Sequence, residues 1–506
     1  MKETVILNGH DLTIEDLVAV ARYGKKVAIS EESQEKILAS EAIVKKIVKS
    51  HVPTYGISTG YGEFSTVCIS EEENATLQRN LIISHACAVG ERFKDDEVRA
   101  IMLLRLNTLC SGYSGVSHEI PQLLAELLNQ NIIPYIPSKG SLGASGDLAN
   151  LAHMALVLLG EGEVVEGDVR RPSAEVLKEH NLEPVVLKGK DGLAIINGTP
   201  VMAGIGTLAL YDAEQLLMAA NQAASLSFEA LMGITAALDP RVHAVRPHPG
   251  QIETAEYILK MLEGSSNINS REGDVQDAYT LRCVPQVHGA VSDALKQVRR
   301  VMEIEINSVT DNPLVFPDKE DVISGGNFHG EPMAINLDYL GIAVSELANI
   351  SERRIERLVN PSLNYGLPAF LVEKGGVNSG FMIPQYTAAA LVSENKVLAH
   401  PGSVDSIPSS ANKEDHVSMG STSARKASVI VENVRNVIAI EWLVAAQASE
   451  LRGVKTFGKG TAQMMKEIRS VAKHYDEDRI MYPDMHAVAE LLADPETVKR
   501  VDSKIQ

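Results

Sequence analysis

The stretch GSTSARKASVIVENVRNVIAIEWLVAAQASELRG, residues 420–453, has neither Gly nor Pro between its two terminal glycines. Apolar residues recur in it at intervals of three and four, the spacing of one helical face. They are Ile430, Val434, Val437, Val444, Ala448 and Leu451. At 1.5 Å per residue the stretch predicts a rod of roughly 45–50 Å. A helix of this length normally buries its apolar stripe against other helices in a bundle.

Two further segments predict long helices. Residues 336–359 have the same apolar spacing, and residues 201–232 form a third candidate, weakened by Gly204 and Gly206. Upstream of residue 200 the chain is divided by glycine-rich loops, with shorter helices predicted at 93–109 and 120–130. We therefore predict a mainly α protein, in which a loop-rich N-terminal portion (residues 1–200) stands on a bundle of long helices (residues 201–506).

Composition excludes several classes of protein. The 506 residues include 47 Lys and Arg against 66 Asp and Glu, so the net charge is −19 and a nucleic-acid partner is not expected. Hydrophobic residues make up 45% and charged residues 22%, which is typical of a globular protein. The uncharged apolar run 148–160 is too short to span a bilayer, so no membrane association is predicted.

The cysteines and the N-terminal segment bear on location. Cys68, Cys87, Cys110 and Cys283 form no CxxC pair, which favours reduced thiols over a disulfide framework. Acidic residues in the first 16 positions are unlike a signal peptide. Together these features predict a cytoplasmic protein.

The loop GSLGASGD at residues 140–147 has the most unusual local sequence of the chain. One interpretation is a tight turn, with Asp147 capping the helix that follows. The loop fits no common phosphate-binding or nucleophile motif, since its glycines do not make GxGxxG, no GK[ST] follows, and GxSxG would need Gly at position 147.

The second interpretation of this loop is chemical. A kinked backbone could bring the Gly146 nitrogen onto the carbonyl carbon of Ala144, and glycine reaches the compressed geometry that this requires. Loss of two waters would then leave a 4-methylidene-imidazole-5-one (MIO) ring, with an exocyclic methylene from Ser145. Such a ring is an electrophile made from the chain itself, so no external cofactor would be needed.

The loop GSLGASGDL resembles the signature of the histidine, phenylalanine and tyrosine ammonia-lyase and aminomutase family. The resemblance continues in family order over nearly the whole chain, in YGISTGYG (55–62), LQRNLIISHACAVGE (77–91), LAIINGTP (193–200), VQDAYTLRCVPQVHGA (275–290), NSVTDNP (307–313), GGNFHGEP (325–332) and the segment 378–420. It implies an MIO formed from Ala144, Ser145 and Gly146, and a homotetramer with active sites shared between subunits.

The resemblance also implies roles for side chains. Tyr55 matches the family's catalytic base, and its phenol, with a pKa of about 10, would need a strong downward shift, which we expect helix N-termini to supply. Arg282 matches the arginine that holds the substrate carboxylate. The remaining implied pocket residues are His85, Asn197, Gln276, Tyr279 and Phe328.

Two positions favour a histidine-directed member. The pair Ser84-His85 resembles that of histidine enzymes, and Glu414 stands where they carry an acid that pairs with the substrate imidazole. A carboxylate facing a phenyl ring would be an unpaired charge, whereas an imidazole gives it a charge-assisted hydrogen bond. Without the resemblance, Glu414 would be a solvated charge in a polar run, and its neighbour Lys413 departs from the family pattern.

The resemblance therefore implies elimination of ammonia from L-histidine to give trans-urocanate. Two alternatives stay open at this point. One is a tyrosine or phenylalanine ammonia-lyase or aminomutase, and the other is a catalytically silent helical oligomer. No metal site is predicted, because there is no HExxH and His153, His329 and His416 are isolated along the chain.

Overall fold

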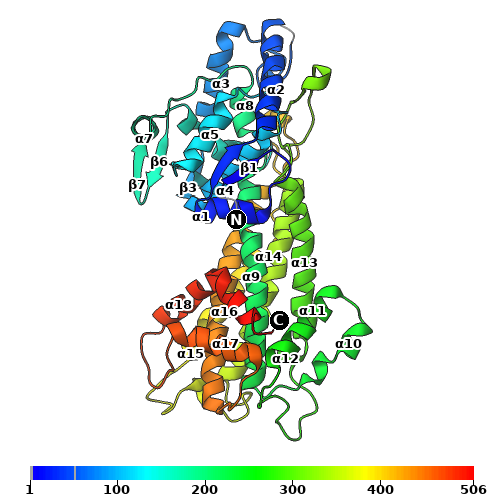
Figure 1. The fold of residues 1–506 in the computed structure, drawn as a ribbon, viewed down its shortest axis with the longest axis vertical. Coiled ribbons are helices and arrows are strands. Elements are labelled where there is room, and N and C mark those ends of the chain that lie inside the picture. The colour runs from blue at the N-terminus through cyan, green and yellow to red at the C-terminus, as the bar shows by residue number, and fades with distance from the viewer. Residues whose placement is uncertain (1–3, 51–52, 506) are drawn as a thin grey trace. The chain divides into compact units, whose positions relative to one another are not determined.

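A computed structural model describes residues 4–50 and 53–505. Over these residues the chain forms nineteen α-helices and nine short strands, which confirms the mainly α prediction (Figure 1). The predicted helices at 421–452, 336–359 and 201–232 are α16 (Gly420–Arg452), α14 (Glu331–Val359) and α9 (Pro200–Ala230). None of the described helices is long and apolar enough to cross a membrane.

Contacts divide the chain into two compact units. Unit one comprises the described residues up to Leu208, together with Arg299–Asp338 and Pro401–Arg425. Unit two comprises Ala209–Val298, Tyr339–His400 and the described residues from Lys426 onward. This division differs from the predicted boundary at residue 200, because α9, α14, α16 and α13 (Val284–Glu305) each begin in one unit and end in the other.

Unit one is built on α4 (Asp95–Cys110), whose residues from Val98 to Cys110 are all buried. The other elements wholly within unit one are β1 (Thr4–Leu7), α1 (Ile14–Tyr23), β2 (Lys26–Ile29), α2 (Glu31–Ser50), α3 (Glu71–His85), β3 (Val89–Arg92), α5 (Glu119–Asn129), β4 (Ile133–Pro134), β5 (Pro137–Lys139), α6 (Leu148–Leu158), β6 (Glu163–Glu166), β7 (Val169–Pro172), α7 (Ser173–Glu179), α8 (Asp191–Ile196), β8 (Leu314–Phe316) and β9 (Asp321–Ile323). The strands are short, with β1–β2 parallel and β3–β5, β4–β6–β7 and β8–β9 antiparallel. The helices α4 and α5 confirm those predicted at 93–109 and 120–130.

Local signals place the elements that carry the candidate site. The hydroxyl of Ser70 accepts a hydrogen bond from the Glu73 backbone N–H and caps the start of α3, which then ends at His85. The helix α6 begins directly after Asp147, at the end of the glycine-rich loop.

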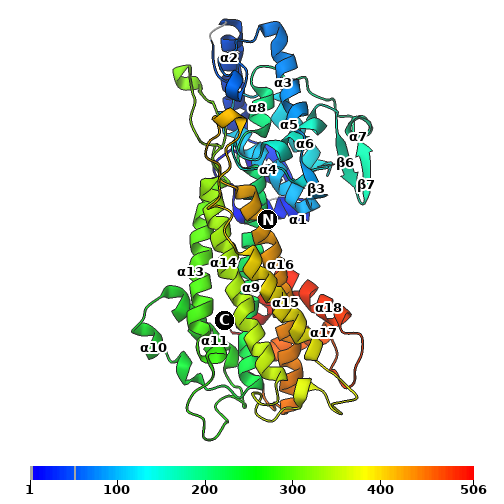
Figure 2. The same ribbon diagram turned by 180° about the vertical axis from the view of Figure 1, so that it is seen from behind.

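Unit two is a bundle of long helices around α16, as Figure 2 shows for α9, α13, α14, α15 and α16. Its remaining helices are α10 (Pro240–Ala244), α11 (Pro249–Leu262), α12 (Tyr279–Arg282), α15 (Met382–Leu398), α17 (Lys459–Val471), α18 (Tyr482–Ala493) and α19 (Pro495–Asp502). Every residue of α16 from 437 to 449 is buried, so this part is a central helix rather than one with a single buried face. Trp442 is fully buried there and donates its indole N–H to the Ala219 carbonyl of α9.

A buried ion pair joins three of these helices. The carboxylate of Glu441 accepts two hydrogen bonds from Arg354, at 2.5 and 2.8 Å, and one each from Ser227 and Ser351. Neither charged side chain is exposed. A carboxylate so far from water is tolerated because all these donors satisfy its oxygens.

We predict that Arg354→Met destabilises the protein by about 3–5 kcal/mol, because it leaves the Glu441 charge buried without its partner. An arginine in a solvent-exposed pair gives the control: Arg241 lies 2.7 Å from Asp239 and is 91% exposed, so Arg241→Met should leave the free energy of unfolding almost unchanged. Thermal and denaturant unfolding of the two variants would measure the difference. Equal decreases in the free energy of unfolding would contradict the prediction that the buried ion pair contributes more than the exposed one.

Candidate active site

The glycine-rich loop is held against the turn before α9. Gly146 pairs with Gly198 in a parallel bridge, the Asp147 N–H donates to the Gly198 carbonyl at 2.7 Å, and the Gly198 N–H donates to the Ser145 carbonyl at 3.1 Å. Gly146 has a φ of +76°, and a Cβ added there would lie 1.8 Å from the Gly198 carbonyl oxygen. Only glycine fits this position, on grounds of both backbone conformation and space.

Asp147 fastens the end of the loop. Its fully buried carboxylate accepts hydrogen bonds from the Val201 and Met202 N–H groups in the first turn of α9, and from the Ser421 hydroxyl in the first turn of α16. Burial raises the pKa of Asp147 to about 6, although these donors oppose the shift. The positive ends of the two helices offset part of the cost of burying the charge.

The loop also contacts the segment before α16. The Met419 N–H donates to the Leu142 carbonyl at 2.9 Å, and the Ser418 hydroxyl donates to the Gly143 carbonyl at 3.2 Å. Loop and segment thus form one hydrogen-bonded assembly, although they are far apart in the sequence.

A cavity of about 850 Å³ in unit one opens onto Ser145. Six of the residues implied by the resemblance line it, namely Tyr55, His85, Ser145, Asn197, Phe328 and Glu414. Ala144 and Gly146 line a smaller neighbouring cavity of about 310 Å³, which shares Ser145, His85 and Glu414 with the first. The structure therefore brings together segments that lie up to several hundred residues apart.

Glu414 faces the loop directly. Its carboxylate accepts a hydrogen bond from the Ser145 hydroxyl at 2.9 Å and another from the Ser409 hydroxyl at 2.9 Å. The neighbouring Lys413 instead lies 3.7 Å from the carboxylate of Glu63, and both of those side chains are exposed. Glu414 is therefore a pocket residue rather than the solvated charge that its polar neighbours suggested.

Tyr55 lies in the loop before α3, on the wall of the same cavity. Burial raises the pKa of its phenol and the charge of Glu414 adds to this, while a hydrogen bond from the Gly62 N–H opposes it. The expected downward shift is therefore wrong for the chain as described, because burial outweighs the single backbone donor.

His85 lies at the C-terminal end of α3, where its Nδ1 is 3.0 Å from the Ser84 hydroxyl. Burial lowers the pKa of the His85 imidazole, against the opposing charge of Glu414. The neutral ring can therefore donate or accept a hydrogen bond within the cavity.

Asn197 is fixed from beneath by buried groups. Its side-chain amide donates to the Asp311 carboxylate at 3.2 Å and to the Asn312 carbonyl at 3.0 Å. Asp311 also pairs with Lys190 at 2.6 Å, and neither of these two side chains is exposed. Among the described residues, the buried amide oxygen of Asn197 has no hydrogen-bond partner.

Gln276, Tyr279 and Arg282 belong to unit two and are not among the residues that line this cavity. Tyr279 is 70% exposed, and the guanidinium of Arg282 lies 4.6 Å from the centre of the Tyr279 ring. Gln276 is exposed as well.

Comparisons with known proteins show the family of the chain. The sequence model for aromatic amino acid lyases matches residues 12–470. The chain belongs to the aromatic amino acid lyase family. A histidine ammonia-lyase of Treponema denticola is 67% identical over 500 residues, covering 99% of this chain and 98% of the relative. A histidine ammonia-lyase of Caldanaerobacter subterraneus is 55% identical over 490 residues, covering 96% of each.

Solved structures of this lyase family have the same fold. The crystal structure of histidine ammonia-lyase from Trypanosoma cruzi has a TM-score of 0.92 and 43% identity, covering 99% of this chain and 96% of that one. The tyrosine aminomutase from Streptomyces globisporus has a TM-score of 0.95 and 38% identity, covering 99% of each chain.

Sequence reasoning missed several buried charges beneath the lyase site. Arg105 is fully buried in α4 and donates to the Asn197 carbonyl, and burial lowers the pKa of its guanidinium to about 10. Asp311 lies in the NSVTDNP motif, but the sequence does not show which cation pairs with its carboxylate. Arg105 and Lys190 gave no signal, since isolated cations in a sequence are usually on the surface.

We predict that Gly146→Ala destabilises the protein by clearly more than the ~1–2 kcal/mol that a left-handed backbone costs a residue with a Cβ. The excess arises because the methyl group must displace the Gly198 backbone. Gly264→Ala is the matched control, since Gly264 has a φ of +87° but nothing within 4 Å of an added Cβ. Unfolding midpoints would measure both, and equal losses would contradict the close approach.

Proposed function

We propose that this aromatic amino acid lyase eliminates ammonia from L-histidine to give trans-urocanate. The observation that carries the proposal is the Glu414 carboxylate, which lies 2.9 Å from the Ser145 hydroxyl on the wall of the cavity. A carboxylate at this place suits an imidazole and is costly against a phenyl or phenol ring. The full-length identity to proteins named histidine ammonia-lyase supports the same substrate.

The residues around Ser145 fit an MIO ring formed from Ala144, Ser145 and Gly146. Ring closure needs a residue at 146 without a Cβ, and the Gly198 carbonyl leaves no room for one. It also needs the loop to hold one conformation, which the buried Asp147 and the Gly198 hydrogen bonds favour. Such a ring would supply an electrophilic carbon, which the side chains of an ordinary protein lack, to activate the substrate amine as a leaving group.

The remaining chemistry falls to side chains of the chain. Tyr55 acts in its deprotonated form, and its phenolate oxygen accepts the β-proton of the substrate as the bond between the α-carbon and the amine breaks. Glu414 binds the imidazole and holds the β-carbon toward Tyr55, since a weakly acidic C–H must be positioned against its base. Asn197 and His85 offer polar contacts to the substrate, and Phe328 packs against it. Arg282 binds the substrate carboxylate, with Gln276 and Tyr279 beside it.

We propose that Gln276, Tyr279 and Arg282 reach the cavity from a neighbouring subunit of a homotetramer. Support comes from exposed apolar side chains, which a monomer in water would normally bury. Those in unit two that are more than half exposed include Val275, Tyr279, Val377, Ile383, Tyr386 and Val397. We also propose a cytoplasmic location, because the four cysteines are all unpaired in the structure.

A tyrosine or phenylalanine ammonia-lyase or aminomutase is the second candidate, favoured by the structural likeness to tyrosine aminomutase. The two candidates are separated by comparing histidine, tyrosine and phenylalanine as substrates of the same preparation. Appearance of urocanate absorbance with histidine alone supports the first proposal. Turnover of tyrosine or phenylalanine at a higher kcat/KM than histidine would overturn it.

We predict that Glu414→Gln lowers kcat/KM for histidine by about 10- to 100-fold, the scale of losing a charged hydrogen-bond partner. Activity on tyrosine or phenylalanine should stay equal or rise, because an unpaired carboxylate is removed. Rates are normalised to the fraction of chains that carry the ring, since Glu414 also contacts Ser145. Lys413→Gln is the control: Lys413 also lines the cavity, but its ammonium lies 3.7 Å from the exposed Glu63, so histidine turnover should be kept or raised.

We predict that Tyr55→Phe keeps histidine binding but lowers kcat by about 10²-fold or more, the scale of losing a positioned base. Because the pKa of Tyr55 is raised in the free chain, wild-type kcat/KM should still be rising with pH above neutrality. Steady-state rates across pH would test both points. A Tyr55→Phe variant with normal turnover would move the role of base to another residue.

A further inference from the structure

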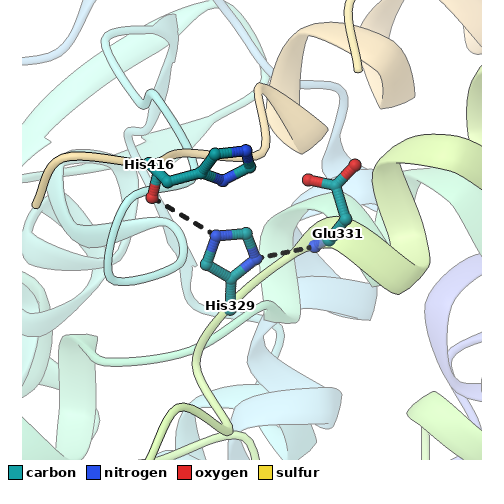
Figure 3. Close-up of side chains that lie close together, drawn as sticks. All are labelled: His329, Glu331 and His416. Atoms are coloured by element: carbon teal, nitrogen blue, oxygen red, sulfur yellow. Dashed lines mark hydrogen bonds between the residues drawn. The ribbon is translucent and has the colours of Figure 1, made fainter. Parts of the chain in front are cut away.

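Three side chains lie close together in Figure 3, and none of them is among the residues that line the cavity of about 850 Å³, hereafter the catalytic cavity. His329 and Glu331 lie at the start of α14, and His416 lies in the irregular segment before α16. Their nearest ligand atoms are all within 4.8 Å of one another. No metal site was predicted from the sequence, because His329 and His416 are 87 residues apart.

The contacts within this cluster are weak. His329 Nδ1 accepts a hydrogen bond from the Glu331 N–H at 3.3 Å, and its Nε2 lies 3.3 Å from the His416 carbonyl oxygen. Both are longer than the usual 2.9–3.0 Å of protein hydrogen bonds. The two imidazole rings stack with centres 5.7 Å apart. A stronger ligand could therefore replace these contacts at little cost.

Glu331 adds the observation that points to a cation. Its Oε2 is buried and has no hydrogen-bond partner in the described structure. A carboxylate oxygen removed from water without a donor is costly, so a positive ligand beside it would restore the lost interaction. In Figure 3 this carboxylate points toward the ring of His416.

We propose that His329, Glu331 and His416 bind a divalent transition-metal ion, with Zn²⁺ the preferred one. Two imidazoles and one carboxylate are a common zinc ligand set, with a water completing the tetrahedron. Zn–N bonds of about 2.0–2.1 Å allow at most about 4.2 Å between two ligand atoms, so small side-chain rotations would close the present spacing. His329 also lines a cavity of about 510 Å³ and His416 is exposed, so an ion can reach these two ligands from solvent.

The ion would link two walls of the catalytic cavity. His329 directly follows Phe328, and His416 comes two residues after Glu414. The segment between Ser409 and Gly420 contains four non-glycine residues of positive φ, namely Ser410, Ala411, Asn412 and Met419. A metal that fixes His416 would hold this segment, and with it the carboxylate of Glu414, in one position. His329, Glu331 and His416 are thus positioning residues, and the site stands independently of the proposed substrate.

One other cluster in the described residues combines imidazole and carboxylate groups, with one histidine and two glutamates: Glu41, His118 and Glu119. There the buried Glu41 is already paired with the ammonium of Lys45 at 2.7 Å and with His118 at 3.1 Å. Its carboxylate therefore has a cation, and we expect no metal to bind. This second cluster supplies a matched control.

The test uses the full-length protein, stripped with a chelator, desalted and titrated with Zn²⁺. We expect one Zn²⁺ per chain by calorimetry and elemental analysis, and a Co²⁺-substituted form with the visible absorption of a tetrahedral site. His416→Ala should weaken Zn²⁺ binding by at least about 100-fold, more than the loss of an outer partner of a metal ligand. His416 is exposed, so folding should be preserved, whereas His118→Ala should leave the stoichiometry at one.

Amide hydrogen exchange gives a readout that does not depend on activity. Zinc should slow exchange severalfold in residues 409–419 of the wild type and leave His416→Ala unchanged. Absence of stoichiometric zinc binding, or binding that His416→Ala does not weaken, would overturn the site. Binding without slower exchange in residues 409–419 would overturn the positioning role.

Discussion

The carboxylate of Asp147 is removed from water and accepts hydrogen bonds from the first turns of two long helices, α9 and α16. Because Asp147 is also the residue before α6, three helix starts meet at the end of the loop 140–147. Burying a charge in this way is costly unless every oxygen is satisfied and helix dipoles favour it. These hydrogen bonds fix the end of the loop, and they restrict it to the backbone conformation in which Gly146 has a positive φ.

The position of the pocket follows from that anchor. The turn at Gly198 lies against Gly146, and the same turn carries Asn197 into the cavity, above Asp311, Lys190 and Arg105. The segment that leads into α16 carries Glu414 to within hydrogen-bond distance of Ser145. Burial raises the pKa of Tyr55 and lowers the pKa of His85, and the charge of Glu414 adds to the first shift and opposes the second.

Much of the fold could be predicted because its signals are local. The absence of Gly and Pro between residues 420 and 453 was enough to predict α16 almost to the residue. Periodicity did not reveal that α16 is buried on all sides near Trp442, since small residues such as Ala445 and Ala446 fit a central helix as well as an exposed face. The discontinuous units could not be predicted either, because they depend on how distant segments pack.

For the candidate site, the residues could be predicted from local motifs, whereas their environment could not. The motifs led to Ser145, Tyr55, Asn197 and Glu414, and the structure brings all four to one cavity. The direction of the Tyr55 pKa shift could not be predicted, because it depends on burial and on a charge some 360 residues away in the chain. The convergence of His329 with His416 could not be predicted either, because the two residues lie in separate motifs and meet only in the fold.

The central claim is that the loop 140–147 is built so that Ala144, Ser145 and Gly146 close into a ring. The most direct measurement is the intact mass of the purified chain. Closure removes two waters, so the wild-type chain should be lighter than the mass calculated from its sequence by about 36 Da. The loss should be located in the peptide that contains residues 144–146. The Ser145→Ala chain should not show the full loss of about 36 Da, because alanine has no hydroxyl to lose as water. A wild-type chain that converts histidine to urocanate at its full sequence mass would contradict the account.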